Sequence, residues 1–212
     1  MADRPFHVLV AHLRSRLTRP LPGAGAHLTM APAYRSQPDK LSIEGKPCRS
    51  AGVLALLFPD GDHTAILLTE RRHDLNRHAG QISFPGGSSE PDEPLHQTAL
   101  RETHEEIGLP PHAIELLGAL SPLYIQVSNF CVYPFVGVLE TPPKNLVLQP
   151  SEVTLIHTLR LADLRLPATR SYEPRLVYGQ TVDVPVFAVN GLSIWGATAM
   201  MLAELLAVCG DG

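Results

Sequence analysis

The sequence predicts an α+β fold in which helices flank a mixed β-sheet. Its 212 residues, 44% apolar and 18% charged, are typical of one globular domain with extensions. The apolar patterns indicate a strand hairpin, one central helix, further strands and a closing helix. Strands grouped before and after a helix in this way are typical of the α+β class.

The N-terminal part of the chain is predicted to be an appendage of the sheet. Residues 5–17 place apolar side chains at helical spacing, which indicates a helix that docks on this domain or on a sister subunit. The second option leaves a homodimer open. Residues 19–50 are rich in Pro, Gly, Ser and Ala and are expected to wrap the surface as a linker. We therefore expect an N-terminal segment, residues 1–49, followed by a folded domain, residues 50–209.

The predicted domain begins with a β-hairpin. Residues 51–58 form a continuous apolar run typical of a buried strand, residues 65–69 form its partner, and residues 59–62 supply the turn. Residues 94–107 are predicted to form the central helix, because a glycine and a proline follow them and stop it. Further strands are expected at 114–120, 130–139, 153–158 and 182–189. Ser193 is expected to cap the closing helix.

Composition and charge exclude several classes of function. The net charge of −4 argues against a nucleic-acid partner, because proteins that grip a phosphate backbone are normally basic. No apolar run is long enough for a membrane span, and the N-terminus lacks a signal-peptide core, so no membrane partner and a cytoplasmic location are expected. Cys48, Cys131 and Cys209 are odd in number and irregularly spaced, which argues against a disulfide framework and a zinc site. A small molecule is the expected partner.

Three glutamates fall on one patch of the predicted helix. Glu105 and Glu106 follow Glu102 by three and four residues, so all three carboxylates share a face. Like charges at this spacing destabilise a helix by roughly 0.2–0.5 kcal/mol per pair, and Arg101 can neutralise Glu105 but cannot serve all three. A hard cation such as Mg²⁺ would resolve the conflict, because it takes carboxylate oxygens together with phosphate oxygens. The alternative, a solvated acidic face, does not explain the glycine-rich loop that precedes the helix.

These glutamates belong to a longer pattern, Gly-x5-Glu-x7-Arg-Glu-U-x-Glu-Glu-x-Gly-U, in which U is aliphatic. The matching positions are Gly87, Glu93, Arg101, Glu102, Glu105, Glu106, Gly108 and Leu109. Thr103, at the first aliphatic position, is the one departure. The pattern resembles the Nudix box. The resemblance implies an α/β/α sandwich with a mixed central sheet, a box folded as loop–helix–loop, and hydrolysis of a diphosphate linked to a second moiety.

The resemblance also implies roles for the acidic residues. Glu102, Glu105 and Glu106 are expected to bind Mg²⁺ or Mn²⁺, which would neutralise the diphosphate and lower the pKa of a bound water. Glu105 and Glu106 are therefore expected catalytic residues. Glu152 stands in a later region from which many Nudix enzymes supply a further metal ligand or a base. The alternative, an ordinary surface-loop glutamate, stays open.

The rest of the box is expected to shape the loop. Glu93 and Arg101 are interpreted as residues that brace it. Gly86 and Gly87 are interpreted as backbone positions at which a side chain would block the metal or a phosphate.

The segment upstream of the box, residues 67–87, carries a further signature. It contains Leu-Leu-Thr-x-Arg and then His-x-Gly-Gln-x-x-Phe-Pro-Gly-Gly. This resembles the signature of coenzyme A diphosphatases within the Nudix superfamily, which implies cleavage of coenzyme A into 3′,5′-ADP and 4′-phosphopantetheine. The expected substrate-binding residues are Arg71, Arg72, Arg77, His78 and Gln81.

Two departures from that signature leave alternatives open. Arg72 stands where a small residue is usual, and Asn76 stands where an arginine is usual, so that Arg77 must supply the phosphate contact. One alternative is a Nudix diphosphatase for a nucleotide sugar, ADP-ribose or a dinucleotide. Another is a non-catalytic nucleotide sensor, which the full set of box carboxylates disfavours.

Overall fold

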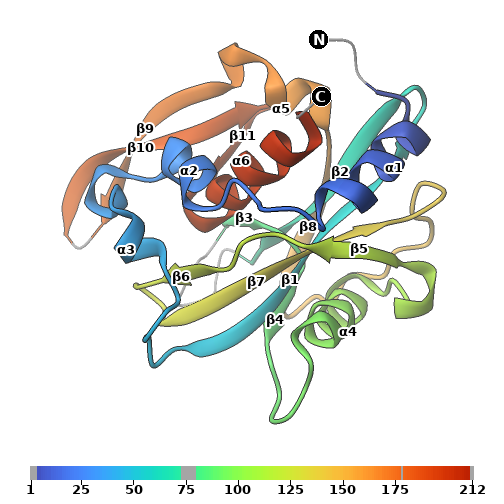
Figure 1. Ribbon diagram of the computed structural model, residues 1–212, viewed down its shortest axis with the longest axis horizontal. Helices are drawn as coiled ribbons and strands as arrows, with labels where there is room; N and C mark the ends of the chain where they lie inside the picture. Colours follow the sequence, from blue (N-terminus) through green and yellow to red (C-terminus); the bar gives the residue numbers. More distant parts are fainter. Residues whose placement is uncertain (1–3, 73–79, 178, 211–212) are drawn as a thin grey trace.

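A mixed sheet forms the centre of the fold (Figure 1). The computed structural model describes residues 4–72, 80–177 and 179–210. Within them, the strands of this sheet are β1 (Arg49–Asp60), β2 (His63–Arg71), β3 (Ile82–Ser83), β4 (Gly86–Ser88), β5 (Glu115–Ala119), β6 (Leu123–Ile125), β7 (Phe130–Val138) and β8 (Val153–Arg160). The order is β3-β2-β1-β7-β5, and β4, β6 and β8 pair with β1, β7 and β2. The β1–β7 pair is parallel, which makes the sheet mixed.

Helices and a second sheet cover the central sheet. The helices are α1 (Phe6–Arg16), α2 (Ala24–His27), α3 (Pro38–Leu41), α4 (Leu95–Ile107), α5 (Leu161–Arg165) and α6 (Gly196–Gly210). Short 3-10 turns occupy Leu28–Met30, Ala33–Arg35, Pro111–Ala113 and Pro167–Thr169. The second sheet has the order β11-β10-β9, from β9 (Arg170–Val177), β10 (Gln180–Val189) and β11 (Leu192–Trp195). In Figure 1, α4 lies on one side of the central sheet, and α6, α1 and α2 lie on the other. The predicted α+β class is confirmed.

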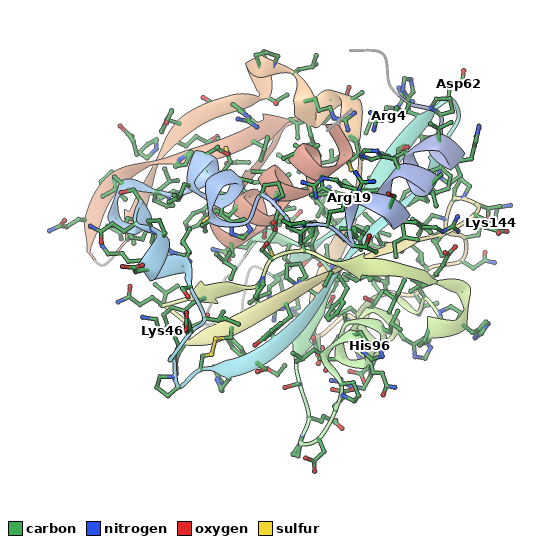
Figure 2. All side chains as sticks on the ribbon, viewed as in Figure 1. Arg4, Arg19, Lys46, Asp62, His96 and Lys144 are labelled. Carbon is green, nitrogen blue, oxygen red and sulfur yellow. A yellow bond between two sulfur atoms is a disulfide. The ribbon has the colours of Figure 1, made fainter. Side chains whose placement is uncertain are left out.

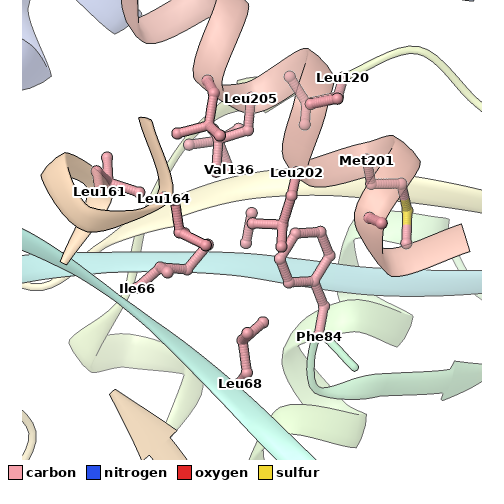
Figure 3. Close-up of a cluster of buried hydrophobic side chains, with 14 of the residues drawn as sticks. Ile66, Leu68, Phe84, Leu120, Val136, Leu161, Leu164, Met201, Leu202 and Leu205 are labelled. Carbon is pink, nitrogen blue, oxygen red and sulfur yellow. The ribbon is translucent and has the colours of Figure 1, made fainter. Parts of the chain in front are cut away.

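The predicted hairpin of β1 and β2 is confirmed and is longer than expected. Asp60 pairs with His63, and Gly61 takes a positive φ of 59° at the turn. Every residue from 51 to 58 is buried, because β1 has a packed layer on each face. Leu54 and Leu56 belong to the core on the α4 side. Intervening residues of β1 belong to the core on the α6 side, where Phe84, Leu202 and other apolar side chains meet (Figure 3).

The N-terminal segment is part of this packing. Helix α1 docks on this chain, with Leu9 and Leu13 buried against α6 and neighbouring elements. Residues 19–50 do not form the plain linker that their composition predicts, because they fold into short helical turns. A buried carboxylate in α6 holds them: Glu204 accepts hydrogen bonds from the Gly23 N–H at 2.8 Å and from the Nε2 of His27 at 3.0 Å.

The prediction for Ser193 is wrong. Residues 192–195 pair with residues 186–189 of β10 and form a strand, and α6 begins only at Gly196. The Ser193 hydroxyl donates to Glu173 across the second sheet at 2.8 Å. A serine shortly before a helix resembles an N-cap in sequence. Here, however, Ser193 pairs with Ala188 in the β10–β11 ladder and is a strand residue.

The prediction that the cysteines form no disulfide is also wrong. Cys48 and Cys131 are joined in a disulfide, with Cα atoms 5.7 Å apart, and Cys209 is buried in α6 (Figure 2). Residues 49 and 130 are partners in the parallel β1–β7 ladder. This pairing brings together two cysteines that are 83 residues apart, which their spacing in the sequence does not indicate.

None of the described helices is long and apolar enough to cross a membrane.

Candidate active site

A cleft of about 480 Å³ runs beside the amino-terminal half of β1. Its walls come from β1, β4, α4, β7 and the start of α6, and residues of the N-terminal segment complete one end. Gly86, Gly87, Glu102 and Glu152 line the other end. Two positions of the box pattern, Gly87 and Glu102, therefore line the wall of this cleft.

Helix α4 lies close against β1 because glycines leave room for it. A Cβ added to Gly52 of β1 would meet the Leu95 carbonyl oxygen at 2.3 Å. Gly86 has a φ of 144° and lies against the backbone of Gly52, where a Cβ would meet the carbonyl oxygen at 2.4 Å. The helix ends as predicted at Gly108, whose φ of 72° is costly for other residues.

The predicted bracing role of Glu93 and Arg101 is supported by their geometry. Arg101 donates from Nε to one carboxylate oxygen of Glu93 at 2.8 Å and from Nη2 to the other at 3.0 Å. Glu93 also accepts from the Thr98 hydroxyl at 2.7 Å. The hydrogen bonds from Arg101 are the main reason that the pKa of Glu93 falls to about 2. The loop is thereby tied to the first turns of α4.

Arg101 also holds two glutamates of the box. Its Nη1 donates to Glu102 at 3.0 Å and to Glu105 at 3.1 Å. The Glu102 carboxylate lies directly against Gly87, where an added Cβ would meet Oε2 at 2.3 Å. Burial raises the pKa of Glu102. Gly87 is therefore needed for the position that Glu102 adopts.

Glu106 is the most deeply buried carboxylate of the site, with 2% of its surface exposed. Its Oε2 accepts a hydrogen bond from the Gly86 N–H at 3.1 Å, and its Oε1 lies 3.9 Å from Nη1 of Arg71. Burial raises its pKa to about 8, and the nearby charges of Glu152 and Glu102 act in the same direction. A carboxylate in these surroundings is stabilised by a cation.

The donor set fits a divalent metal ion. Glu102, Glu106 and Glu152 are near enough to repel one another electrostatically, and carboxylate oxygens are the ligands that Mg²⁺ and Mn²⁺ prefer. Glu105 differs from them, because its side chain is 54% exposed and pairs with Arg101. Among the described residues, no three acidic, His or Cys side chains form a ready-made metal cage.

Only some of the predicted substrate-binding residues line the cleft. Arg71 and Gln81 line the cleft. Arg72 does not, because its Nη1 donates to the Pro150 carbonyl at 2.7 Å and its backbone N–H donates to the Glu152 carbonyl at 3.1 Å. Arg72 thus anchors the loop that carries Glu152.

Two further substrate predictions, Arg77 and His78, lie outside the described residues.

Sequence reasoning missed the end of the cleft away from the glutamates. Arg49, Phe130 and Tyr34 line it, and they come from three separate parts of the chain. No motif connects these residues. Parallel pairing of Arg49 with Phe130 brings two of them together, and sequence spacing contains no signal for that register.

Comparisons with known proteins agree with this architecture. Residues 48–178 match the NUDIX domain family. Uncharacterised Nudix hydrolases named NudL, from Salmonella paratyphi B and Salmonella newport, are each 36% identical over 143 residues, covering 66% of this chain and 72% of theirs.

Two solved structures are similar in fold alone. The MutT protein of Methanosarcina mazei has a TM-score of 0.51 at 17% identity, covering 78% of this chain and 96% of its own. A MutT/nudix family protein from Enterococcus faecalis has a TM-score of 0.50 at 16% identity, covering 87% of this chain and 72% of its own. The family match over residues 48–178 and the 36% identity to the NudL proteins show that the chain belongs to the Nudix family and is a hydrolase of phosphorus-containing acid anhydrides.

Proposed function

We propose that this protein hydrolyses the diphosphate bond of coenzyme A to 3′,5′-ADP and 4′-phosphopantetheine, with Mg²⁺ or Mn²⁺ as cofactor. One observation carries the proposal. Residues of the upstream signature, Arg71, Gln81 and Phe84, line the same cleft as Glu102 and Glu152 of the hydrolytic end. The signature that resembles coenzyme A diphosphatases therefore belongs to the wall that a substrate would contact.

The metal would be held by Glu102, Glu105 and Glu106, with Glu152 beside them as the base. When bound, it supplies Lewis acidity toward the diphosphate oxygens and toward water. Glu105 would exchange its 3.1 Å contact with Arg101 for the metal, since its side chain is 54% exposed and can turn toward the ion. Arg101 and Glu93 keep the amino-terminal end of the box loop tied to α4, so the ligands stay in place as the substrate arrives.

The remaining residues position the diphosphate. Gly86 and Gly87 line the cleft, and the absence of a Cβ at Gly87 lets the Glu102 carboxylate lie against the loop where the diphosphate would bind. Arg71, which lines the cleft 3.9 Å from Glu106, orients a phosphate oxygen by a charge-assisted hydrogen bond. Glu152 accepts the proton of the attacking water, and Arg72 holds its loop for that task.

A hydrolysis panel tests the proposal. The purified full chain would be given coenzyme A, ADP-ribose and diadenosine tetraphosphate with Mg²⁺ or Mn²⁺, and products would be identified by mass spectrometry. We expect the highest kcat/KM for coenzyme A, with 3′,5′-ADP and 4′-phosphopantetheine as products, and loss of turnover with EDTA. A higher kcat/KM for either other substrate would overturn the assignment of coenzyme A and leave the diphosphatase chemistry intact.

A further inference from the structure

The end of the cleft away from the glutamates carries a flat cationic surface. The guanidinium carbon of Arg49 lies 4.2 Å from the centroid of the Phe130 ring. Its Nη2 donates to the Ser128 carbonyl at 3.3 Å. Arg49 is exposed overall, yet these two contacts fix the plane of its guanidinium group. The surface is thus preformed in the cleft wall.

The strand register places this surface relative to the hydrolytic end. Arg49, Ala51 and Val53 alternate along β1 and all line the cleft. Val53 pairs with Gly86, and Arg49 pairs with Phe130. Four residues of strand separate the two pairs, which is about 13 Å at 3.3 Å per residue. A diphosphate seated at Gly86 would therefore extend its ribose and base, or its other substituent, toward Arg49.

The Arg49–Phe130 end of the cleft suits the nucleotide base better than the other substituent of the diphosphate. We propose that Arg49 and Phe130 form a subsite that binds the planar base of the substrate nucleotide by stacking. A guanidinium plane backed by an aromatic ring stacks on any nucleobase, and its charge complements the phosphates that the ribose of the same nucleotide carries. The pantetheine arm is flexible and has no aromatic face, so it gains little from such a surface. The subsite rests on the proposed function only in requiring a nucleoside diphosphate derivative as substrate.

The N-terminal segment contributes to the same end. Tyr34 lines the cleft there, and the buried Arg35 beside it donates to the Tyr124 carbonyl. Tyr34 lies outside residues 48–178, which match the family. The cleft that contains the subsite is therefore lined in part by a residue outside the matched Nudix domain.

Binding of the two halves of a nucleotide tests the subsite without any hydrolysis. The full chain would be titrated by calorimetry with 5′-AMP, ribose 5-phosphate and 4′-phosphopantetheine. We expect 5′-AMP to bind about tenfold or more tightly than ribose 5-phosphate, because only 5′-AMP has a base to stack. Equal affinities for those two ligands in the wild-type protein would overturn the subsite.

Variants locate the base contact. Arg49→Met and Phe130→Leu should each remove the preference for 5′-AMP and leave 4′-phosphopantetheine affinity unchanged. Arg49→Lys keeps the positive charge but has no planar guanidinium group, so it should also lack the preference for 5′-AMP over ribose 5-phosphate. Arg160→Met is the matched control, because Arg160 is an arginine at the surface that pairs with Asp60 outside the cleft. Thermal unfolding of each variant shows that the fold is intact.

Three outcomes contradict the inference. They are an undiminished preference for 5′-AMP in Arg49→Met, a full preference in Arg49→Lys, and a loss in Arg49→Met of affinity for 4′-phosphopantetheine alone. With coenzyme A as substrate, Arg49→Met should raise KM about tenfold at nearly constant kcat, since the lost contact is made equally in ground and transition states. If coenzyme A is not cleaved but Arg49→Met abolishes the preference for 5′-AMP, the proposed function fails and the subsite stands.

Discussion

Gly87→Ala tests whether the position of the Glu102 carboxylate matters for catalysis. The new methyl group would lie 2.3 Å from Oε2 and 2.4 Å from Cδ of Glu102, whereas ordinary contacts begin near 3.4 Å. The carboxylate must therefore retreat by about 1 Å, a displacement that typically costs about 100-fold in rate. The clash involves the end of a side chain, and Gly87 does not require a positive φ, so the fold should be retained. We expect kcat to fall about 100-fold with an unchanged unfolding midpoint.

Two other glycine substitutions serve as controls for Gly87→Ala. Gly25→Ala adds a methyl group with nothing within 4 Å, so turnover should equal that of the wild type. Gly52→Ala would press on the Leu95 carbonyl at 2.3 Å, so it should lower the unfolding midpoint as well as the activity, because backbone must move. Steady-state kinetics and urea unfolding of all three variants measure these differences. A Gly87→Ala enzyme within about threefold of wild-type kcat would refute the assigned role of Glu102.

Two further predictions concern buried carboxylates. Glu106→Gln should lower kcat by about 100-fold or more, because the amide replaces a proposed metal ligand. The free energy of unfolding should be unchanged or higher, because burial already disfavours the ionised form of Glu106. Wild-type turnover in this variant, measured with saturating Mg²⁺, would contradict the metal assignment. Glu204→Gln should destabilise the protein by about 2–3 kcal/mol at pH 7, because the amide NH2 replaces one of two accepting oxygens and faces the N–H donors that this oxygen served. Burial opposes ionisation of Glu204, but hydrogen bonds from His27 and Ser121 outweigh it and lower the pKa of Glu204. Its stabilising contribution is therefore complete above the unfolded pKa of about 4.5 and is lost as the pH falls toward the lower folded pKa. Urea unfolding of both proteins at pH 7 and pH 3 should show the gap narrowing, and a constant gap would contradict this linkage.

The sequence predicted the elements whose signals are local. The apolar run at residues 51–58 indicates a strand buried on both faces, and the structure buries all of it. Helix α4 was predicted to within one residue, because its end at Gly108 depends on the backbone freedom of that residue. A structural role for Glu93 and Arg101 in bracing the loop was expected, but that the two residues pair with each other is seen only in the structure.

Features that depend on contacts between residues far apart in the sequence were predicted wrongly or not predicted at all. Ser193 resembled a helix cap, but strand β10 competes for its backbone. The composition of residues 19–50 resembled a linker, but the carboxylate of Glu204 holds the segment in place. Adjacent residues with the same charge, Arg71 and Arg72, have different surroundings, because successive side chains near a strand end point in different directions.

The sequence by itself therefore determined the catalytic loop, the helix that follows it and the chemistry of its carboxylates. Only the tertiary structure decided which residues form the far end of the cleft and that Cys48 meets Cys131. The physical reason is the range of the interactions. A helix period or a glycine turn depends on neighbours within a few residues, whereas the β1–β7 register depends on how the whole sheet packs between two layers.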